Sequence, residues 1–104
     1  MDKTLCCAPL LKEAIAADDA AELASAFKAL ADPVRLQLLS LIAESDEACS
    51  CNMEAVVGKS QGTVSHHLSI LADAGLITKE KIGRWVYCSV VPARMKALRA
   101  VLGS

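Results

Sequence analysis

The chain has 104 residues, a net charge of −1 and an apolar content of 54%, with only 3% aromatic residues. This length is typical of one domain, so we expect residues 1–104 to form a single folded unit. Charged residues interrupt the apolar positions near the N-terminus, which excludes a signal peptide or a membrane span and indicates a cytoplasmic protein. The Ala- and Leu-rich composition favours a small helical fold that completes its core by dimerising.

The two halves of the chain carry opposite charge. Residues 1–58 contain four Lys or Arg and ten Asp or Glu, giving −6, whereas residues 59–104 contain seven Lys or Arg and two Asp or Glu, giving +5. The C-terminal half is therefore the part expected to bind a negatively charged partner such as a nucleic acid.

The N-terminal half is predicted to consist of a tail and short helices. We expect residues 1–8 to form a mobile tail and residues 10–15 a short helix. Asp18-Asp19 is an N-cap signal for a longer helix. Its apolar side should carry Leu23, Phe27 and Leu30.

A second boundary lies at Asp32-Pro33, where Asp32 is predicted to cap a helix and Pro33 to occupy its first position. The apolar stripe of this helix is Val34, Leu38, Leu41 and Ile42. Residues 51–57 predict a short helix that ends at Gly58 and packs through Met53, Val56 and Val57.

Residues 60–74 predict a helix capped by Ser60 and ended by Gly75. Its core side is Val64, Leu68 and Leu71. The opposite side is small and polar, with Gly62, Ser65, His66, Ser69 and Asp73. His67 lies on the flank of the helix, so we interpret it mainly as a packing residue.

Two strands, 77–82 and 85–91, are predicted on either side of a tight turn at Gly83-Arg84. Pro92 then begins a final helix. Its apolar side, a predicted dimer face together with the N-terminal helix, is Met95, Leu98, Val101 and Leu102.

This order of elements predicts a mainly α protein with a β-hairpin wing, a winged helix-turn-helix. The polar side of a single helix is usually just a solvated surface. Here the helix is followed by a basic hairpin, and the combination indicates double-stranded DNA as the partner. The residues predicted to contact DNA are Lys59, Ser60, Gln61, Thr63, Ser65, His66, Ser69, Lys81 and Arg84.

Five cysteines form two close pairs and one isolated residue. Cys6-Cys7 and Cys49-Ser50-Cys51 are expected to be reduced thiols that bind a soft ion, because thiolates select ions such as Cd(II), Pb(II), As(III) and Sb(III). Cys88 shares a strand face with Val86 and Val90, so it is predicted to be a buried and inert residue. A thiol enzyme is excluded because the chain has no Cys-x-x-Cys and nothing places a base beside a cysteine. A thiol redox switch stays open as an alternative.

Several segments resemble the ArsR/SmtB family of metal-responsive winged-helix repressors. They are Phe27 to Leu39, Cys49-Ser50-Cys51, Ser60 to Leu68, Ala74 to Ile77 and Gly83 to Tyr87. The resemblance covers residues 20–102 and implies a homodimer that binds operator DNA and leaves it when a toxic ion binds. It also implies that Cys49 and Cys51 are ligands, completed by Cys6 and Cys7 from the N-terminus.

Other positions depart from the family pattern. Glu54 stands where relatives often have a further cysteine, Gly62 where they have Pro or Ser, and Ser69 where they have Lys. The last helix lacks His, Asp and Glu, which excludes the zinc site that some relatives build there.

Two types of inducer fit the cysteines. Four thiolates would suit tetrahedral Cd(II) or Pb(II), whereas three thiolates form a neutral trigonal site around As(III) or Sb(III). The adjacent pair Cys6-Cys7 resembles that of arsenic sensors and is awkward in a regular tetrahedron. We therefore favour As(III) or Sb(III), with Cys51 as the preferred third ligand and Cys49 next.

Overall fold

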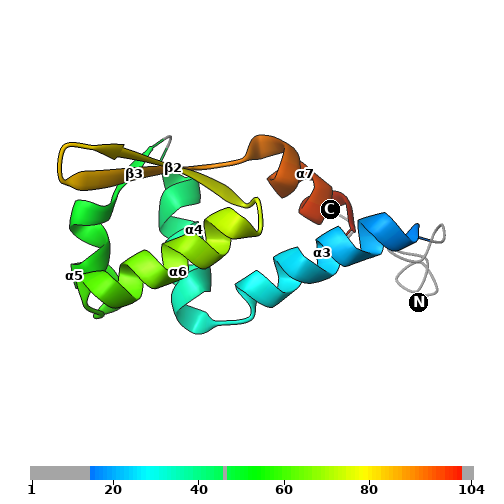
Figure 1. The fold of residues 1–104 in the computed structure, drawn as a ribbon, viewed down its shortest axis with the longest axis horizontal. Helices are drawn as coiled ribbons and strands as arrows, with labels where there is room; N and C mark the ends of the chain where they lie inside the picture. The colour runs from blue at the N-terminus through cyan, green and yellow to red at the C-terminus, as the bar shows by residue number, and fades with distance from the viewer. Residues whose placement is uncertain (1–14, 46, 102–104) are drawn as a thin grey trace.

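The computed structural model describes residues 15–45 and 47–101 (Figure 1). The predicted tail 1–8 and helix 10–15 therefore lie almost wholly outside the described residues. The elements are, in chain order, α3 (Ala17–Leu30), α4 (Pro33–Glu44), β1 (Ala48–Cys49), the 3-10 turn η1 (Ser50–Asn52), α5 (Met53–Val57), α6 (Gln61–Asp73), β2 (Ile77–Ile82), β3 (Trp85–Val90) and α7 (Pro92–Val101). None of the described helices is both long and apolar enough to cross a membrane.

The start of α4 is fixed by the predicted Asp-Pro signal. The Asp32 carboxylate accepts hydrogen bonds from the backbone N–H of Val34 at 2.9 Å and of Arg35 at 3.1 Å, and Pro33 begins the helix. The hydrogen bond from Arg35 is the main cause that lowers the pKa of Asp32 below its ordinary value of 3.8. The charged carboxylate therefore stabilises the folded chain.

Asp32→Asn is expected to lower the melting temperature at neutral pH, because asparagine caps the helix without a charge. A depressed folded-state pKa gives stability that is present above the unfolded pKa and is lost as pH falls through the folded one. The difference between wild type and variant should therefore vanish in acid, below the ordinary carboxyl value of 3.8. Thermal melts followed by circular dichroism between pH 7 and pH 2 measure it. A difference that stays constant with pH would contradict this role.

Helix α3 departs from its predicted start and packing face. It begins at Ala17 with Ala16 as N-cap and no side-chain cap, so Asp18 and Asp19 lie inside the first turn. There they face the positive end of the helix dipole, which favours them without a capping bond. The buried residues are Ala26 and Ala29, while Leu23 and Leu30 are partly buried and Phe27 is 38% exposed. The prediction that Phe27 faces the core is wrong for the single chain.

The core lies between α4, α6 and the sheet. Leu38, Ile42, Leu71 and Leu76 are completely buried at its centre, as is the thiol-bearing Cys88. The stripe predicted for α4 is therefore confirmed at Leu38 and Ile42, while Val34 and Leu41 are half-buried. On α7, Leu98 belongs to this core and Met95 packs against it, so part of the predicted dimer stripe is used within one chain. Leu102 lies outside the described residues.

The hairpin forms the predicted wing, and a third strand joins it. β2 and β3 pair antiparallel from Ile77↔Val90 to Ile82↔Trp85. Strand β1 pairs with the other edge of β3 through Ala48↔Cys88 and Cys49↔Tyr87, giving the strand order β1-β3-β2. The prediction of a mainly α protein with a β-hairpin wing is thus confirmed, with one short strand added.

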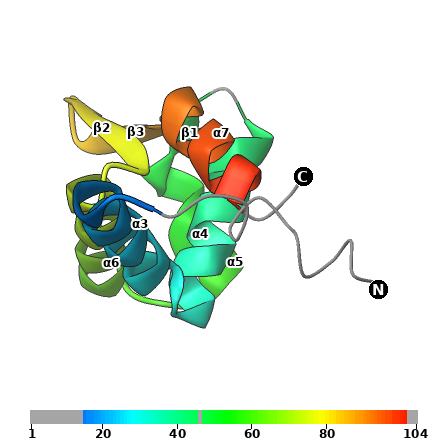
Figure 2. The same ribbon diagram turned by 90° about the vertical axis from the view of Figure 1, so that its right-hand side faces the viewer.

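The elements divide the molecule into two ends. Helices α5 and α6 begin at the same end as the tip of the wing, whereas α7 and the start of α3 lie at the opposite end (Figure 1). Seen from that opposite end, α4 runs between α6 and α5 beneath the sheet (Figure 2).

Helix α5 ends at Gly58, whose φ of 69° gives the predicted left-handed C-cap. Val56 is 52% exposed, so the prediction that it packs inward is wrong. A helix of five residues has room for a single buried anchor, and Met53 supplies it.

Candidate nucleic-acid interface and thiol site

Helix α6 has the features of a recognition helix. Ser60 caps it by accepting from the Thr63 N–H at 3.3 Å, and the Ser60 and Thr63 hydroxyls are 3.1 Å apart. Val64, Leu68 and Leu71 are buried, so they fix which side of the helix faces outward. The predicted cap, core side and glycine end of this helix are confirmed.

A side-chain contact links α6 to α4. The Arg35 Nη1 atom lies 3.1 Å from Nδ1 of His67, and the same guanidinium donates through Nε to the Ala29 carbonyl at the end of α3. Because a guanidinium only donates, His67 must accept through Nδ1. His67 is half-buried, in agreement with a packing role. The neighbouring His66 is exposed.

A hollow between α6 and the wing gathers part of the predicted DNA-contact set. Gln61 and Ser65 of α6 line one side, and Arg84 of the wing lines the other. The Arg84 guanidinium lies 5.4 Å from the Trp85 ring centroid, which restrains it at the tip of the hairpin. The remaining lining residues are Ser50, Glu54, Val64, Leu68, Lys79 and Val86.

The other predicted contact residues lie outside this hollow. Lys59, Ser60, Thr63, His66 and Lys81 are all exposed, the first three around the N-terminus of α6. Ser69 is half-buried, and its hydroxyl accepts a hydrogen bond from Nζ of Lys79 at 2.9 Å.

Lys79 is a candidate DNA-contact residue that sequence reasoning missed. It stands opposite the buried Cys88 on the sheet, on the side that faces α6. Its ammonium reaches Ser69, where a family relative would carry Lys on the helix itself. The sequence contained a signal for this placement, because Lys79 lies two residues after Ile77 in the same strand and Ile77 is buried. A strand residue two positions from a core residue shares its face.

Replacing Lys79 with methionine should weaken binding to all DNA sequences alike. It should also lower the slope of log affinity against log salt by about one unit per protomer, because each phosphate contact releases about one counterion. Methionine keeps the apolar stem, so packing changes little. Fluorescence anisotropy over a salt series measures the slope. Lys96→Met, an exposed position on α7, is the matched control, and equal slopes for both variants would contradict a phosphate contact at Lys79.

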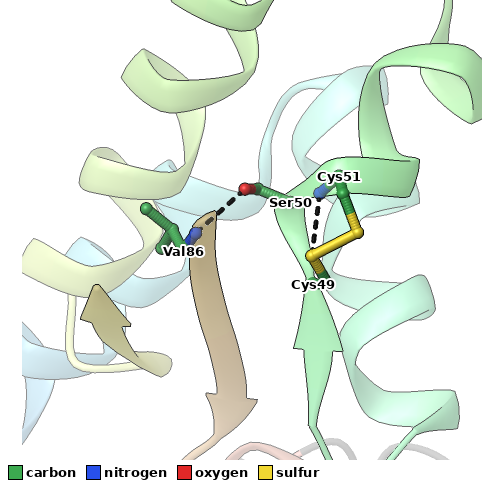
Figure 3. The surroundings of a disulfide bond; sticks show 4 residues. All are labelled: Cys49, Ser50, Cys51 and Val86. Carbon is green, nitrogen blue, oxygen red and sulfur yellow. Dashed lines mark hydrogen bonds between the residues drawn. A yellow bond between two sulfur atoms is a disulfide. The ribbon is translucent and has the colours of Figure 1, made fainter. Parts of the chain in front are cut away.

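The Cys49-Ser50-Cys51 segment follows β1 and enters η1. The structure joins Cys49 and Cys51 in a disulfide, whereas the sequence predicted two reduced thiols (Figure 3). The spacing explains the contact, because residues two apart at the start of a tight turn bring both sulfurs together. The Cys51 N–H also donates to Sγ of Cys49 at 3.1 Å. Cys49 is half-buried and Cys51 is exposed, so a reagent or an ion can reach this pair.

Cys6 and Cys7 lie outside the described residues, so the four-cysteine set stays a prediction. Within residues 15–45 and 47–101, no three His, Cys, Asp or Glu side chains form a group that could hold a metal ion. Cys88 is a free, completely buried thiol, as predicted. Burial raises its pKa, which keeps it protonated and unreactive.

The capped recognition helix, the basic wing and the hollow between them define a winged helix-turn-helix DNA-binding protein. Residues 32–79 match the model of the bacterial regulatory protein arsR family. The chain is 41% identical over 75 residues to an uncharacterized HTH-type transcriptional regulator of Methanocaldococcus jannaschii, a match that spans 72% of this chain and 84% of that one. The chain belongs to the ArsR family, and it is a transcriptional regulator, not an enzyme.

Two further relatives carry more specific names. An arsenical resistance operon repressor of Bacillus subtilis is 43% identical over 61 residues, which are 59% of this chain and 58% of that repressor. A homolog of the cadmium resistance regulatory protein CadC in Staphylococcus aureus is 31% identical over 87 residues, with 84% and 72% covered.

Solved structures share the fold. An ArsR family transcriptional regulator superposes with a TM-score of 0.71 at 26% identity, covering 80% of this chain and 84% of that one. The antimony-specific transcriptional repressor AntR superposes with a TM-score of 0.70 at 31% identity, covering 84% and 79%.

Proposed function

We propose that this chain is a repressor that binds operator DNA as a homodimer and is released when As(III) or Sb(III) binds its cysteine thiolates. The observation that carries the proposal is the contact between the sulfurs of Cys49 and Cys51, beside the hollow that contains Gln61, Ser65 and Arg84. A soft ion bound there sits next to the DNA-reading surface. Ion binding and DNA binding are then coupled by proximity.

The chemistry of the cysteines supports a trivalent metalloid. Once Cys49 and Cys51 are reduced, their two thiolates lie close together on one short segment. This contact makes Cys49 a ligand beside Cys51, which changes the sequence-based preference for Cys6 and Cys7 with Cys51. One of Cys6 and Cys7 then supplies the third thiolate. Three thiolates neutralise As(III) or Sb(III) completely. The names of the arsenical resistance repressor and the antimony-specific repressor point in the same direction.

Cd(II) or Pb(II) bound by all four thiolates is the alternative. The CadC homolog supports it by name, at lower identity than the arsenical repressor. A tetrahedral site would need both residues of the adjacent pair Cys6-Cys7 on one ion together with Cys49 and Cys51.

The DNA side of the proposal follows from symmetry. One recognition helix per protomer reads one half-site, so a two-fold dimer requires half-sites about one helical turn apart. The basic C-terminal half of each protomer then faces the DNA, and the acidic N-terminal half faces away.

The test is operator release measured by fluorescence anisotropy for the reduced protein against As(III), Sb(III), Cd(II), Pb(II) and Zn(II). Release at the lowest concentrations by As(III) and Sb(III) is expected. Release by Cd(II) or Pb(II) alone would establish the alternative. Retention of operator with every ion would overturn the ion-sensing proposal.

A redox switch is a second candidate, favoured by the disulfide between Cys49 and Cys51. Formation of this bond passes two electrons from the two thiols to a disulfide oxidant such as glutathione disulfide, which is reduced to two thiols. Operator affinity of the oxidised and reduced protein, each without metal, tests it. Equal affinity of the two forms would exclude a redox switch.

A further inference from the structure

We propose that Ser50, the residue between the two cysteines, transmits the state of the thiol pair to the wing. The inference rests on the proposed function only in naming the thiol pair as the sensor. Ser50 neither binds the ion nor contacts DNA in this proposal. It is a positioning residue that holds β3 through one hydrogen bond.

The hydrogen bond between Val86 and Ser50 takes the place of a backbone hydrogen bond between β1 and β3. Strand β1 is two residues long, and its pairing with β3 ends at Cys49↔Tyr87. The next amide of β3 along this edge belongs to Val86, and it donates to Oγ of Ser50 at 3.1 Å (Figure 3). An amide left without a partner there would cost free energy, so the Ser50 hydroxyl extends the ladder by one bond.

Ser50 touches both surfaces that the function requires. On one side its backbone lies inside the small ring that joins the sulfurs of Cys49 and Cys51. On the other side Ser50 lines the hollow together with Gln61, Ser65 and Arg84. Val86, the residue that it holds, lies two positions after Arg84 on the wing.

The ring explains why the state of the sulfurs affects the wing. A disulfide holds the two sulfurs at about 2.05 Å, whereas two thiolates that share an ion are kept further apart by that ion. The backbone between them must turn to accommodate the change, and the Ser50 Cβ–Oγ bond turns with it. The hydrogen bond to Val86 then lengthens or breaks, and the base of the wing shifts relative to α6.

The experiment compares Ser50→Ala with Ser50→Thr and with Ser40→Ala, an exposed serine on α4. Operator affinity is measured with and without As(III), and As(III) binding to the free protein is followed by ultraviolet absorption. The expected wild-type coupling is about 5- to 150-fold in operator affinity. Ser50→Ala should still bind As(III) within about twofold of wild type, but its operator affinity without As(III) should already be lowered toward that of ion-bound wild type, so most of this coupling is lost. Ser50→Thr and Ser40→Ala should keep it.

Full coupling in Ser50→Ala would overturn the inference. If Ser50→Ala unfolds, the wild-type protein decides by itself through hydrogen exchange at the Val86 amide. Exchange should be faster with As(III) bound to the thiol pair than after oxidation with glutathione disulfide, because the hydrogen bond from Val86 to Ser50 is present in the disulfide form. The reduced protein without As(III) is the third state compared. Identical exchange in all three states would overturn the role of Ser50. Failure of As(III) to release wild type, with a difference on oxidation, would reject only the metalloid as the signal.

Discussion

Replacing Cys51 with serine should give a repressor that still binds its operator but is no longer released by As(III). A serine hydroxyl is neither soft nor ionised at neutral pH, so it cannot replace a thiolate on the metalloid. Ion binding and DNA binding weaken each other by the same factor. A variant that no longer binds the ion therefore loses the response to the ion, while its own affinity for DNA is unchanged. The expected loss is the whole coupling, about 5- to 150-fold. Anisotropy titration of labelled operator with and without As(III) measures it.

The double variant Cys6→Ser, Cys7→Ser should behave in the same way. Cys88→Ala is the control, because this thiol is completely buried and its pKa is raised by burial. It should be released like wild type. Full release of the Cys51→Ser protein would reject Cys51 as a ligand, and loss of response in Cys88→Ala alone would move the sensor into the core of the sheet.

The second large effect concerns sequence discrimination. Gln61→Ala or Ser65→Ala should reduce the ratio of operator to random-DNA affinity, because both side chains face the hollow from the recognition helix. A good base contact is worth about 1–3 kcal/mol, which corresponds to roughly 5- to 150-fold. Arg84→Ala should instead weaken both kinds of DNA and reduce the salt slope by about one unit per protomer.

Competition titrations with operator and random duplexes separate these roles. Thr63→Ala is not a suitable control, since Thr63 takes part in the cap of α6. Asp73→Ala is better, because Asp73 is exposed at the far end of the same helix. A variant of Arg84 that changed sequence preference but left the salt slope intact would reverse the assignment.

The elements that the sequence predicted well are those with strong local signals. Asp32-Pro33, Ser60 and the left-handed glycines Gly58, Gly75 and Gly83 all stand at the boundaries expected for them. These residues act through their own backbone geometry or a bond to the next turn, so tertiary contacts are not needed to interpret them.

The features that the sequence did not predict depend on distant partners. β1 has only two residues, too few for an alternating pattern, and it exists because the edge of β3 is free to pair. Phe27 fits an apolar stripe, but α3 turns its small residues Ala26 and Ala29 inward. Lys79 became a candidate only when the register placed it opposite Cys88, beside Ser69. The thiol pair was predicted from spacing, whereas its bond to the wing through Ser50 was not.

The Arg35 side chain links three helices, because it extends from α4 and contacts both α3 and α6. One guanidinium holds the last turn of α3 through Ala29 and the middle of α6 through His67, while its own backbone belongs to the capped start of α4. α6 is therefore anchored to α3 by polar contacts with fixed geometry as well as by apolar packing, which tolerates sliding. A displacement of the end of α3 is therefore expected to reach α6 through Arg35, and with it Gln61 at the N-terminal end of the recognition helix.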